Sequence, residues 1–195
     1  MERKISLKRV TKETDITLTL NLDGRGSPRI ETGIPFMNHM LTLFAVHGGF
    51  DLEILAKGDL EVDDHHTVED VGIVLGQAIS KALGERKGIT RYGEATLPMD
   101  EALAGVYLDL SNRPYLCYKV DYPAQKSGSF DLELVEEFFR AVAFNGGITL
   151  HIHKICGKNG HHIAEAVFKG FARALCQSVR VTGDGETLPS SKGVL

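Results

Sequence analysis

Phe44-Ala45-Val46-His47-Gly48-Gly49-Phe50-Asp51-Leu52-Glu53-Ile54 is matched later in the chain by Val142-Ala143-Phe144-Asn145-Gly146-Gly147-Ile148-Thr149-Leu150-His151-Ile152. In both stretches a Gly-Gly pair ends an apolar segment. The residues that follow alternate in polarity, as they do in a half-buried strand. Two such matched stretches in one chain indicate a duplicated structural module.

A five-residue pattern follows each stretch: His65-His66-Thr67-Val68-Glu69 in the first half and His161-His162-Ile163-Ala164-Glu165 in the second. The residues before the two patterns, Asp63-Asp64 and Asn159-Gly160, favour the N-cap of a helix. On a helix, a histidine and a glutamate three or four positions later share one face, and together they bind divalent transition metals. A simpler interpretation has the histidines capping the helix and the glutamate complementing its dipole, which explains the glutamates better than it explains four histidines. We therefore predict a duplicated metal site.

The repeat also predicts a remote ligand in each half. Eight residues before His47 stands His39, and eight residues before its counterpart Asn145 stands Glu137. We expect His39 to join the first histidine pair and its glutamate, and Glu137 to join the second. The predicted metal ligands are His39, His65, His66, Glu69, Glu137, His161, His162 and Glu165.

The hydrophobic pattern predicts an α+β fold, because alternating segments indicate strands and segments with apolar residues three or four apart indicate helices. The expected strands cover residues 14–22, 50–56, 103–110, 114–120 and 148–155, and the expected helices cover residues 35–47, 68–83, 132–144 and 163–179. Each half then has the order β-β-α-β-α, with antiparallel or mixed sheets and helices packed on one face. Because no low-complexity linker separates the halves, we expect one domain over residues 1–195, made of halves of about 1–95 and 96–195.

The composition is that of an ordinary globular chain, with 43% apolar and 25% charged residues among 195. A net charge of -4 and a pI near 6.1 offer no basic field for nucleic acid or an anionic membrane. The charged N-terminus lacks the apolar run of a signal peptide, and no segment is long enough to span a bilayer. Cys117, Cys156 and Cys176 form no CxxC pair, which fits reduced thiols in the cytoplasm. We interpret the cysteines as structural, together with His151 and His153, which share one strand face.

Five longer motifs are more specific than the repeat alone: Pro35-Phe36-Met37-Asn38-His39-Met40-Leu41, Asp63-Asp64-His65-His66-Thr67-Val68-Glu69-Asp70, Ser111-Asn112-Arg113-Pro114-Tyr115, Gly157-Lys158-Asn159-Gly160-His161-His162-Ile163-Ala164-Glu165 and Pro189-Ser190-Ser191-Lys192-Gly193. Together they resemble the imidazoleglycerol-phosphate dehydratase family over nearly the whole chain. The resemblance implies a duplicated α+β fold, two manganese ions (Mn²⁺) per site, and a symmetric homo-oligomer, a 24-mer, with active sites between subunits. One departure is Glu137, where some family members carry histidine, although a carboxylate can replace imidazole on a hard ion such as Mn²⁺.

The resemblance also implies a reaction, the metal-dependent conversion of D-erythro-imidazoleglycerol phosphate to imidazole-acetol phosphate in histidine biosynthesis. The proton that must leave lies on a carbon with no adjacent carbonyl group, so the imidazole ring has to assist. A deprotonated ring, stabilised by one ion on each nitrogen, expels the hydroxyl from the adjacent carbon and makes the neighbouring C–H acidic. This imidazolate-assisted loss of water gives a chemical reason for a duplicated metal site.

The same resemblance assigns roles to residues outside the repeat. Glu13 matches a substrate-contacting glutamate and is our candidate for proton transfer, whereas we interpret the acidic pair Asp100-Glu101 as structural. Fixed cations and hydroxyl donors suit a phosphate group. The sequence leaves open whether the C-terminal tail, with its glycine-rich approach and Ser-Ser-Lys end, closes over the substrate as a lid. The predicted substrate-binding residues are Glu13, His39, His47, His65, Glu69, Arg91, Arg113, His161, Lys169, Ser190, Ser191 and Lys192.

Two other functions would use the same kinds of ligand. A binuclear metallohydrolase also holds two metals with histidine and carboxylate, but its usual aspartate-bridged patterns are absent from this sequence. A metal-dependent assembly or storage protein would use the repeats to join subunits and would need no phosphate-binding residues. Substitution of Arg91 or Lys192 separates these functions, because it would abolish turnover only in an enzyme while leaving assembly and metal content intact.

Overall fold

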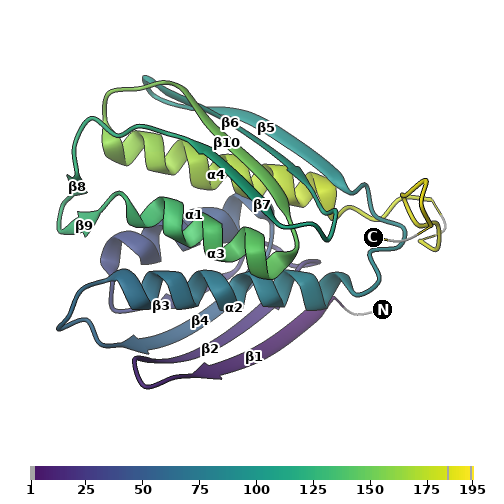
Figure 1. Ribbon diagram of the computed structural model, residues 1–195, viewed down its shortest axis with the longest axis horizontal. Coiled ribbons are helices and arrows are strands. Elements are labelled where there is room, and N and C mark those ends of the chain that lie inside the picture. Colours follow the sequence, from purple (N-terminus) through teal and green to yellow (C-terminus); the bar gives the residue numbers. More distant parts are fainter. Residues whose placement is uncertain (1–2, 184, 194) are drawn as a thin grey trace.

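Two four-stranded sheets, one from each half of the chain, enclose four long helices (Figure 1). The computed structural model describes residues 3–183, 185–193 and 195. Met1, Glu2 and Asp184, which belong to the charged N-terminus and the tail considered above, lie outside the described residues. The first sheet has the order β1-β2-β4-β3 and the second β5-β6-β10-β7. The strands of the first sheet are β1 (Lys4–Val10), β2 (Thr14–Asn21), β3 (Pro28–Glu31) and β4 (Asp51–Gly58), and those of the second are β5 (Tyr92–Met99), β6 (Ala102–Asp109), β7 (Tyr115–Lys119) and β10 (Thr149–Cys156).

The remaining elements complete each half. Helices α1 (Pro35–Gly48) and α2 (His65–Leu83) belong to the first half, and α3 (Leu134–Gly146) and α4 (Gly160–Ser178) belong to the second. A small two-stranded hairpin, β8 (Lys126–Ser127) and β9 (Phe130–Asp131), precedes α3. In both sheets the strand before the first helix runs parallel to the strand after it, and the other pairs are antiparallel.

The predicted α+β class, the duplication and the placement of helices on one face of each sheet are confirmed. The predicted order β-β-α-β-α is wrong, because three strands of the main sheet precede the first helix in each half, which gives β-β-β-α-β-α apart from the β8–β9 hairpin. The predicted residue ranges leave three strands of the two main sheets uncovered: β1, β3 and β5. In β1 only Ile5 and Leu7 pack partly against the core, between the polar residues Lys4, Ser6 and Lys8, and β3 has only four residues, so neither has a strong apolar pattern. Strand β5 spans the predicted division near residue 95 and pairs with β6, so the second sheet already begins at Tyr92.

The four helices pack in pairs that join the two halves. The rings of Phe44 on α1 and Phe171 on α4 lie 5.5 Å apart. Helix α2 approaches α3 through two glycines: a Cβ atom on Gly72 would lie 2.8 Å from the Phe138 carbonyl oxygen, and one on Gly76 would lie 2.6 Å from that of Val142. Because a step of four residues on α2 matches a step of four on α3, these two helices run parallel.

Parallel packing brings the N-terminal ends of the long helices to one end of the molecule, at the left of Figure 1. At the opposite end, a buried arginine ties the two halves together. Arg86 follows α2 and donates to the carbonyl oxygens of Gly146 (2.7 Å) and Gly147 (3.0 Å), which the end of α3 leaves without helical partners. Burial lowers the pKa of Arg86 from its ordinary value.

The core lies between each sheet and its helices. The alternating apolar residues of β2, Ile16, Leu18 and Leu20, are fully buried, and phenylalanines from α1, α3 and α4 fill the centre. Among the described residues, no helix is long and apolar enough to cross a membrane.

Candidate metal centre

Both histidine pairs lie in the first turn of a helix. Helix α4 begins at Gly160 and α2 at His65, three residues before the predicted starts, so each pair and its glutamate share the first two turns. Asn159 caps α4 as predicted, because its side-chain oxygen accepts from the backbone N–H groups of His161 (3.0 Å) and His162 (3.4 Å). In α2 the N-cap residue is Asp64, but the side chain that accepts from His65 N, at 2.7 Å, belongs to Asp63.

The residues that we call the His39 cluster are His39 on α1 and His161, Glu165 and Lys169 on α4. Glu165 Oε1 accepts from His39 Nε2 at 2.9 Å and from His161 Nε2 at 3.1 Å, and its Oε2 accepts from Lys169 Nζ at 2.6 Å. One ligand atom from each of His39, His161 and Glu165 lies within 4.8 Å of the other two. Two imidazole nitrogens and a carboxylate oxygen this close together form a donor set that suits a divalent transition-metal ion.

Glu165 is the electrostatic centre of this cluster. It is 7% exposed, and burial, the largest single effect, raises the pKa of its carboxyl. The hydrogen bonds from Lys169, His39 and His161 together outweigh burial and lower the pKa of Glu165 to about 2. Glu165 is therefore a fixed negative charge at neutral pH, as a metal ligand must be.

The predicted grouping of ligands by halves is wrong for His39. It contacts the glutamate and the first histidine of the second motif, on α4, whereas we expected it beside the motif of its own half. The reason is the helix pairing, because α1 packs on α4 and carries its ligand to the other half. Helix packing thus brings the remote residue of the first half to the motif of the second half.

The helix register places Glu137 at the level of the first motif. One turn before the contact between Gly72 and Phe138, residues 68–69 of α2 are level with residues 134–138 of α3, the neighbouring helix that carries Glu137. His65 and Glu69 are half-buried on that turn of α2, and Arg140 Nε lies 3.5 Å from Glu137 Oε2. The repeat therefore relates His39, His161 and Glu165 to Glu137, His65 and Glu69. In the part of the chain that the structure describes, only the first of these sets brings its three ligand atoms within 4.8 Å of one another.

The second histidine of each pair is oriented by a carboxylate. His66 Nδ1 donates to Asp59 at 3.0 Å, and His162 Nδ1 donates to Glu101 at 2.7 Å. These bonds raise the pKa of both histidines, and the bond from His162, together with backbone N–H donors, lowers the pKa of Glu101 to about 2. In metal sites, a carboxylate that accepts from one ring nitrogen of a histidine typically fixes the orientation of the ring, and so the direction in which the other nitrogen points.

Sequence reasoning missed Asp59 and interpreted Glu101 as structural. Glu101 also accepts from the backbone N–H groups of Lys158 (3.2 Å) and Asn159 (2.8 Å), so it holds the loop before α4 as well as His162. No signal in the sequence indicates this, because both carboxylates come from loops that only the folded sheets bring to the helix ends.

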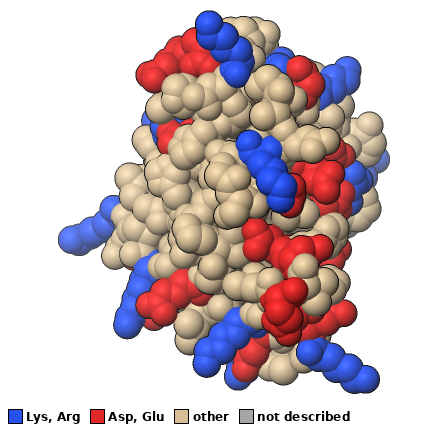
Figure 2. Space-filling model, turned by 90° about the vertical axis from the view of Figure 1, so that its left-hand side faces the viewer, with Lys and Arg blue, Asp and Glu red and all other residues tan. Residues whose placement is uncertain are grey.

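A second carboxylate lies near each of the two histidines His66 and His162. Glu13, in the β1–β2 turn, has an oxygen 4.0 Å from His66 Nε2, and Asp100, in the β5–β6 turn, has one 3.9 Å from His162 Nε2. Figure 2 looks onto this end of the molecule, where acidic side chains gather in the right half of the view. The structure thus places Glu13 beside the first motif.

Two positively charged residues of α4, Lys169 and Arg173, lie near His47 of α1. His47 lies two turns after His39 on the same helix. Burial is the main effect that lowers the pKa of His47, and the positive charges of Lys169 and Arg173 lower it further.

The other predicted phosphate ligands lie at the far end of the molecule. Arg91 is buried, donates to both oxygens of Asp109 (2.7 and 3.0 Å), and binds the Pro189 carbonyl oxygen at 2.6 Å. Arg113 is exposed, with a nitrogen 3.8 Å from Asp109, and Ser190, Ser191 and Lys192 follow Pro189 in the tail.

The length of α4 separates Arg91 from the His39 cluster. Arg91 N donates to the carbonyl oxygen of Ser178, the last residue of that helix, while His161 lies in its first turn. Seventeen residues at a helical rise of about 1.5 Å place them roughly 25 Å apart. One chain therefore does not bring Arg91, Arg113 and the tail to its own His39 cluster.

Comparisons with known proteins agree with this geometry. A sequence profile of the family described as imidazoleglycerol-phosphate dehydratase matches residues 32–175. The imidazoleglycerol-phosphate dehydratase of Acetivibrio thermocellus is 59% identical over 195 residues, covering 100% of both chains, and that of Desulfotalea psychrophila is 59% identical over 193 residues, covering 99% of this chain and 96% of the relative.

Solved structures give the same result. The crystal structure of imidazoleglycerol-phosphate dehydratase from Staphylococcus aureus superimposes with a TM-score of 0.84 at 44% identity, covering 92% of this chain and 99% of that one. The structure from Pyrococcus furiosus gives a TM-score of 0.84 at 39% identity, covering 97% and 100%. The chain therefore belongs to the imidazoleglycerol-phosphate dehydratase family, which acts in histidine biosynthesis.

Proposed function

We propose that this protein converts imidazoleglycerol phosphate to imidazole-acetol phosphate with the help of two Mn²⁺ ions. The observation that carries the proposal is the convergence of His39, His161 and Glu165 from two different helices onto one point. A helix cap or a dipole effect would explain neither the remote histidine nor a carboxylate held ionised by three cationic or donor groups. The cytoplasm is the proposed location.

The residues present fit a hard or borderline divalent ion. We assign one ion to His39, His161 and Glu165 and the other to Glu137, His65 and Glu69, with His66 and His162 as further ligands through the Nε2 atoms that Asp59 and Glu101 leave available. When bound, such ions draw electron density from the substrate imidazole and favour loss of its ring proton. Mn²⁺ accepts this mixture of imidazole and carboxylate, and Glu137 would supply a carboxylate where some family members carry histidine.

The remaining chemistry belongs to side chains near the metal ligands. Glu13 extends from the β1–β2 turn to within 4.0 Å of His66, and in that position it would move the proton on the carbon chain of the substrate. Lys169 of the His39 cluster and His47, which lies near it, would contact the polar part of the substrate.

The complete site requires a second copy of the chain. Arg91 is about 25 Å from the His39 cluster of the same chain, much farther than one small phosphorylated imidazole can reach. Arg113, which lies near Asp109, and the tail residues after Pro189, which are Ser190, Ser191 and Lys192, belong to the same end of the molecule as Arg91. We infer that these residues hold the phosphate of a substrate bound to the metals of a neighbouring copy, in a homo-oligomer for which the family resemblance suggests 24 subunits.

Turnover by chelator-stripped protein, with and without added Mn²⁺, tests the reaction. We expect the ketone product to form only when the ion is present. If folded protein rebinds about two ions per chain without turnover, the metals serve assembly or another reaction, and the dehydratase proposal is wrong for this chain.

Mixed oligomers test the shared site. His161→Asn removes a metal ligand and Arg113→Ala removes an exposed phosphate candidate, so we expect each variant alone to be inactive. Co-assembly of the two variants would restore part of the activity if sites lie between copies, because some sites then combine two intact contributions. Mixed oligomers that remain inactive would show that each chain builds its own site.

A further inference from the structure

A second group of metal-ligating side chains lies on the outer face of the second sheet, away from the helices. Cys117 is on β7, and His151 and His153 are on β10. Because β7 and β10 run parallel with Cys117 opposite His151, and because His151 and His153 are two residues apart, the three side chains project from the same face. One ligand atom from each lies within 4.8 Å of the other two, and Cys117 Sγ lies 3.9 Å from His153 Nε2.

These distances are close to those of a tetrahedral zinc site. Metal–sulfur and metal–nitrogen bonds of about 2.3 and 2.0 Å require a sulfur-to-nitrogen separation of roughly 3.5 Å in tetrahedral geometry. The observed separation between Cys117 and His153 exceeds this by a few tenths of an ångström, which small side-chain rotations supply. All three residues are half-buried, so an ion can reach them from solvent.

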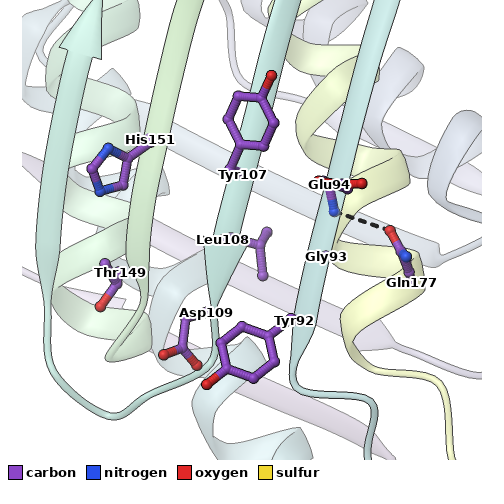
Figure 3. A pocket seen from close by; sticks show the side chains of 9 residues that line it. All are labelled: Tyr92, Gly93, Glu94, Tyr107, Leu108, Asp109, Thr149, His151 and Gln177. Carbon is purple, nitrogen blue, oxygen red and sulfur yellow. Dashed lines mark hydrogen bonds between the residues drawn. The ribbon is translucent and has the colours of Figure 1, made fainter.

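Neighbouring tyrosines hold both imidazole rings. The Tyr115 ring lies 5.6 Å from His151, and the Tyr107 ring lies 6.3 Å from His153. Tyr107 lies over Gly105, where a Cβ atom would meet its hydroxyl at 2.8 Å, so the glycine makes room for the ring beside His153. Figure 3 shows His151, Tyr107 and Glu94 on three neighbouring strands of this face.

The duplication does not account for this group. In the first sheet the corresponding strands pair Arg29 with Glu53, whose side chains form an ion pair at 3.3 Å, and Leu55 stands where the second sheet has His153. The second half therefore has three potential metal ligands where the first half has a surface ion pair and a leucine. Lys119, opposite His153, is exposed and is the nearest cation in the register of β7 and β10.

We propose that Cys117, His151 and His153 form an accessory site for a thiophilic divalent ion such as Zn²⁺, with the fourth position open to water. A thiolate with two imidazoles favours zinc over manganese, which prefers oxygen-rich sites and is the weakest binder in the divalent series. The chain would then carry two chemically different kinds of metal site, and the accessory site stands independently of the dehydratase proposal.

Cobalt is the probe, because a thiolate bound to Co²⁺ gives a charge-transfer absorption that histidine and carboxylate ligands do not give. Titration of the chelator-treated full-length protein should produce this band, and its final intensity should correspond to one thiolate-bound ion per chain. We expect the band to be lost in Cys117→Ser and retained in Cys156→Ser, which removes a more exposed thiol outside the group. It should also survive Glu165→Gln, and stoichiometric Zn²⁺ should abolish it, whereas excess Mn²⁺ should not.

His153→Gln provides a second test that does not depend on the folding of Cys117→Ser. Loss of this ligand should weaken Co²⁺ binding, measured by the same band, at least about tenfold. A wild-type protein without a thiolate band would overturn the assignment. So would a band that persists in Cys117→Ser, or one that Cys156→Ser removes.

Discussion

Glu165→Gln tests whether the glutamate of the second motif is the electrostatic centre of the His39 cluster. The pKa of Glu165 is lowered from 4.5 to about 2, and each unit corresponds to about 1.4 kcal/mol, so the ionised carboxylate stabilises the metal-free fold by roughly 3 kcal/mol at pH 7. Because the folded-state pKa is lower than the unfolded one, this contribution is complete above the unfolded pKa. It falls to about half near pH 3 and disappears below the folded pKa.

The assay is urea unfolding of chelator-stripped wild-type and variant protein at one fixed protein concentration. The difference in unfolding free energy should be about 3 kcal/mol at pH 7 and about 1.5 kcal/mol at pH 3. Glu69→Gln is the matched control, because Glu69 holds the same place in the first motif but has Ile73 four residues later, where Glu165 has Lys169. We expect the control to lose less than about 1 kcal/mol. A difference for Glu165→Gln that is the same at both pH values, or an equal loss in the control, would refute the reasoning.

Three other predictions concern positions to which the sequence assigned no role in the site. Glu101→Gln should weaken Mn²⁺ binding about 10- to 100-fold, because the hydrogen bond that fixes His162 loses its charge. Calorimetric titration measures this affinity, and an unchanged value would mean that Glu101 only holds the loop. Arg86→Leu should lower the unfolding free energy by about 3 kcal/mol in urea titrations, because two buried carbonyl groups at the end of α3 lose a charged donor. An unfolding free energy equal to that of the wild type within error would show that water replaces the arginine. Gly76→Ala should cost about 1–3 kcal/mol in the same assay, since its Cβ atom would lie 2.6 Å from the Val142 carbonyl oxygen, and a neutral effect would mean that α2 and α3 separate easily.

Local structure and the residue types of the candidate site follow from the sequence alone. Apolar alternation in β2 and the spacing of apolar residues in α1 are local properties, so their bounds agree with the prediction to within one residue. The motif helices start three residues earlier than predicted, because Asn159 caps α4 from outside and draws both histidines into its first turn. The missed β1 and β3 have weak apolar patterns, since they lie at the two edges of their sheet.

Which candidate ligands meet depends on how the helices and strands pack. A repeat relates residues that are equivalent, not residues that are close, so nothing in the sequence places His39 beside Glu165 instead of Glu69. Helix packing made that choice, since α1 packs on α4 and the glycines of α2 admit the backbone of α3. The same holds for Cys117 and His153, which are far apart in the chain and become neighbours only because β7 pairs with β10. Contacts between distant segments depend on the packing of whole elements, and no local pattern records that packing.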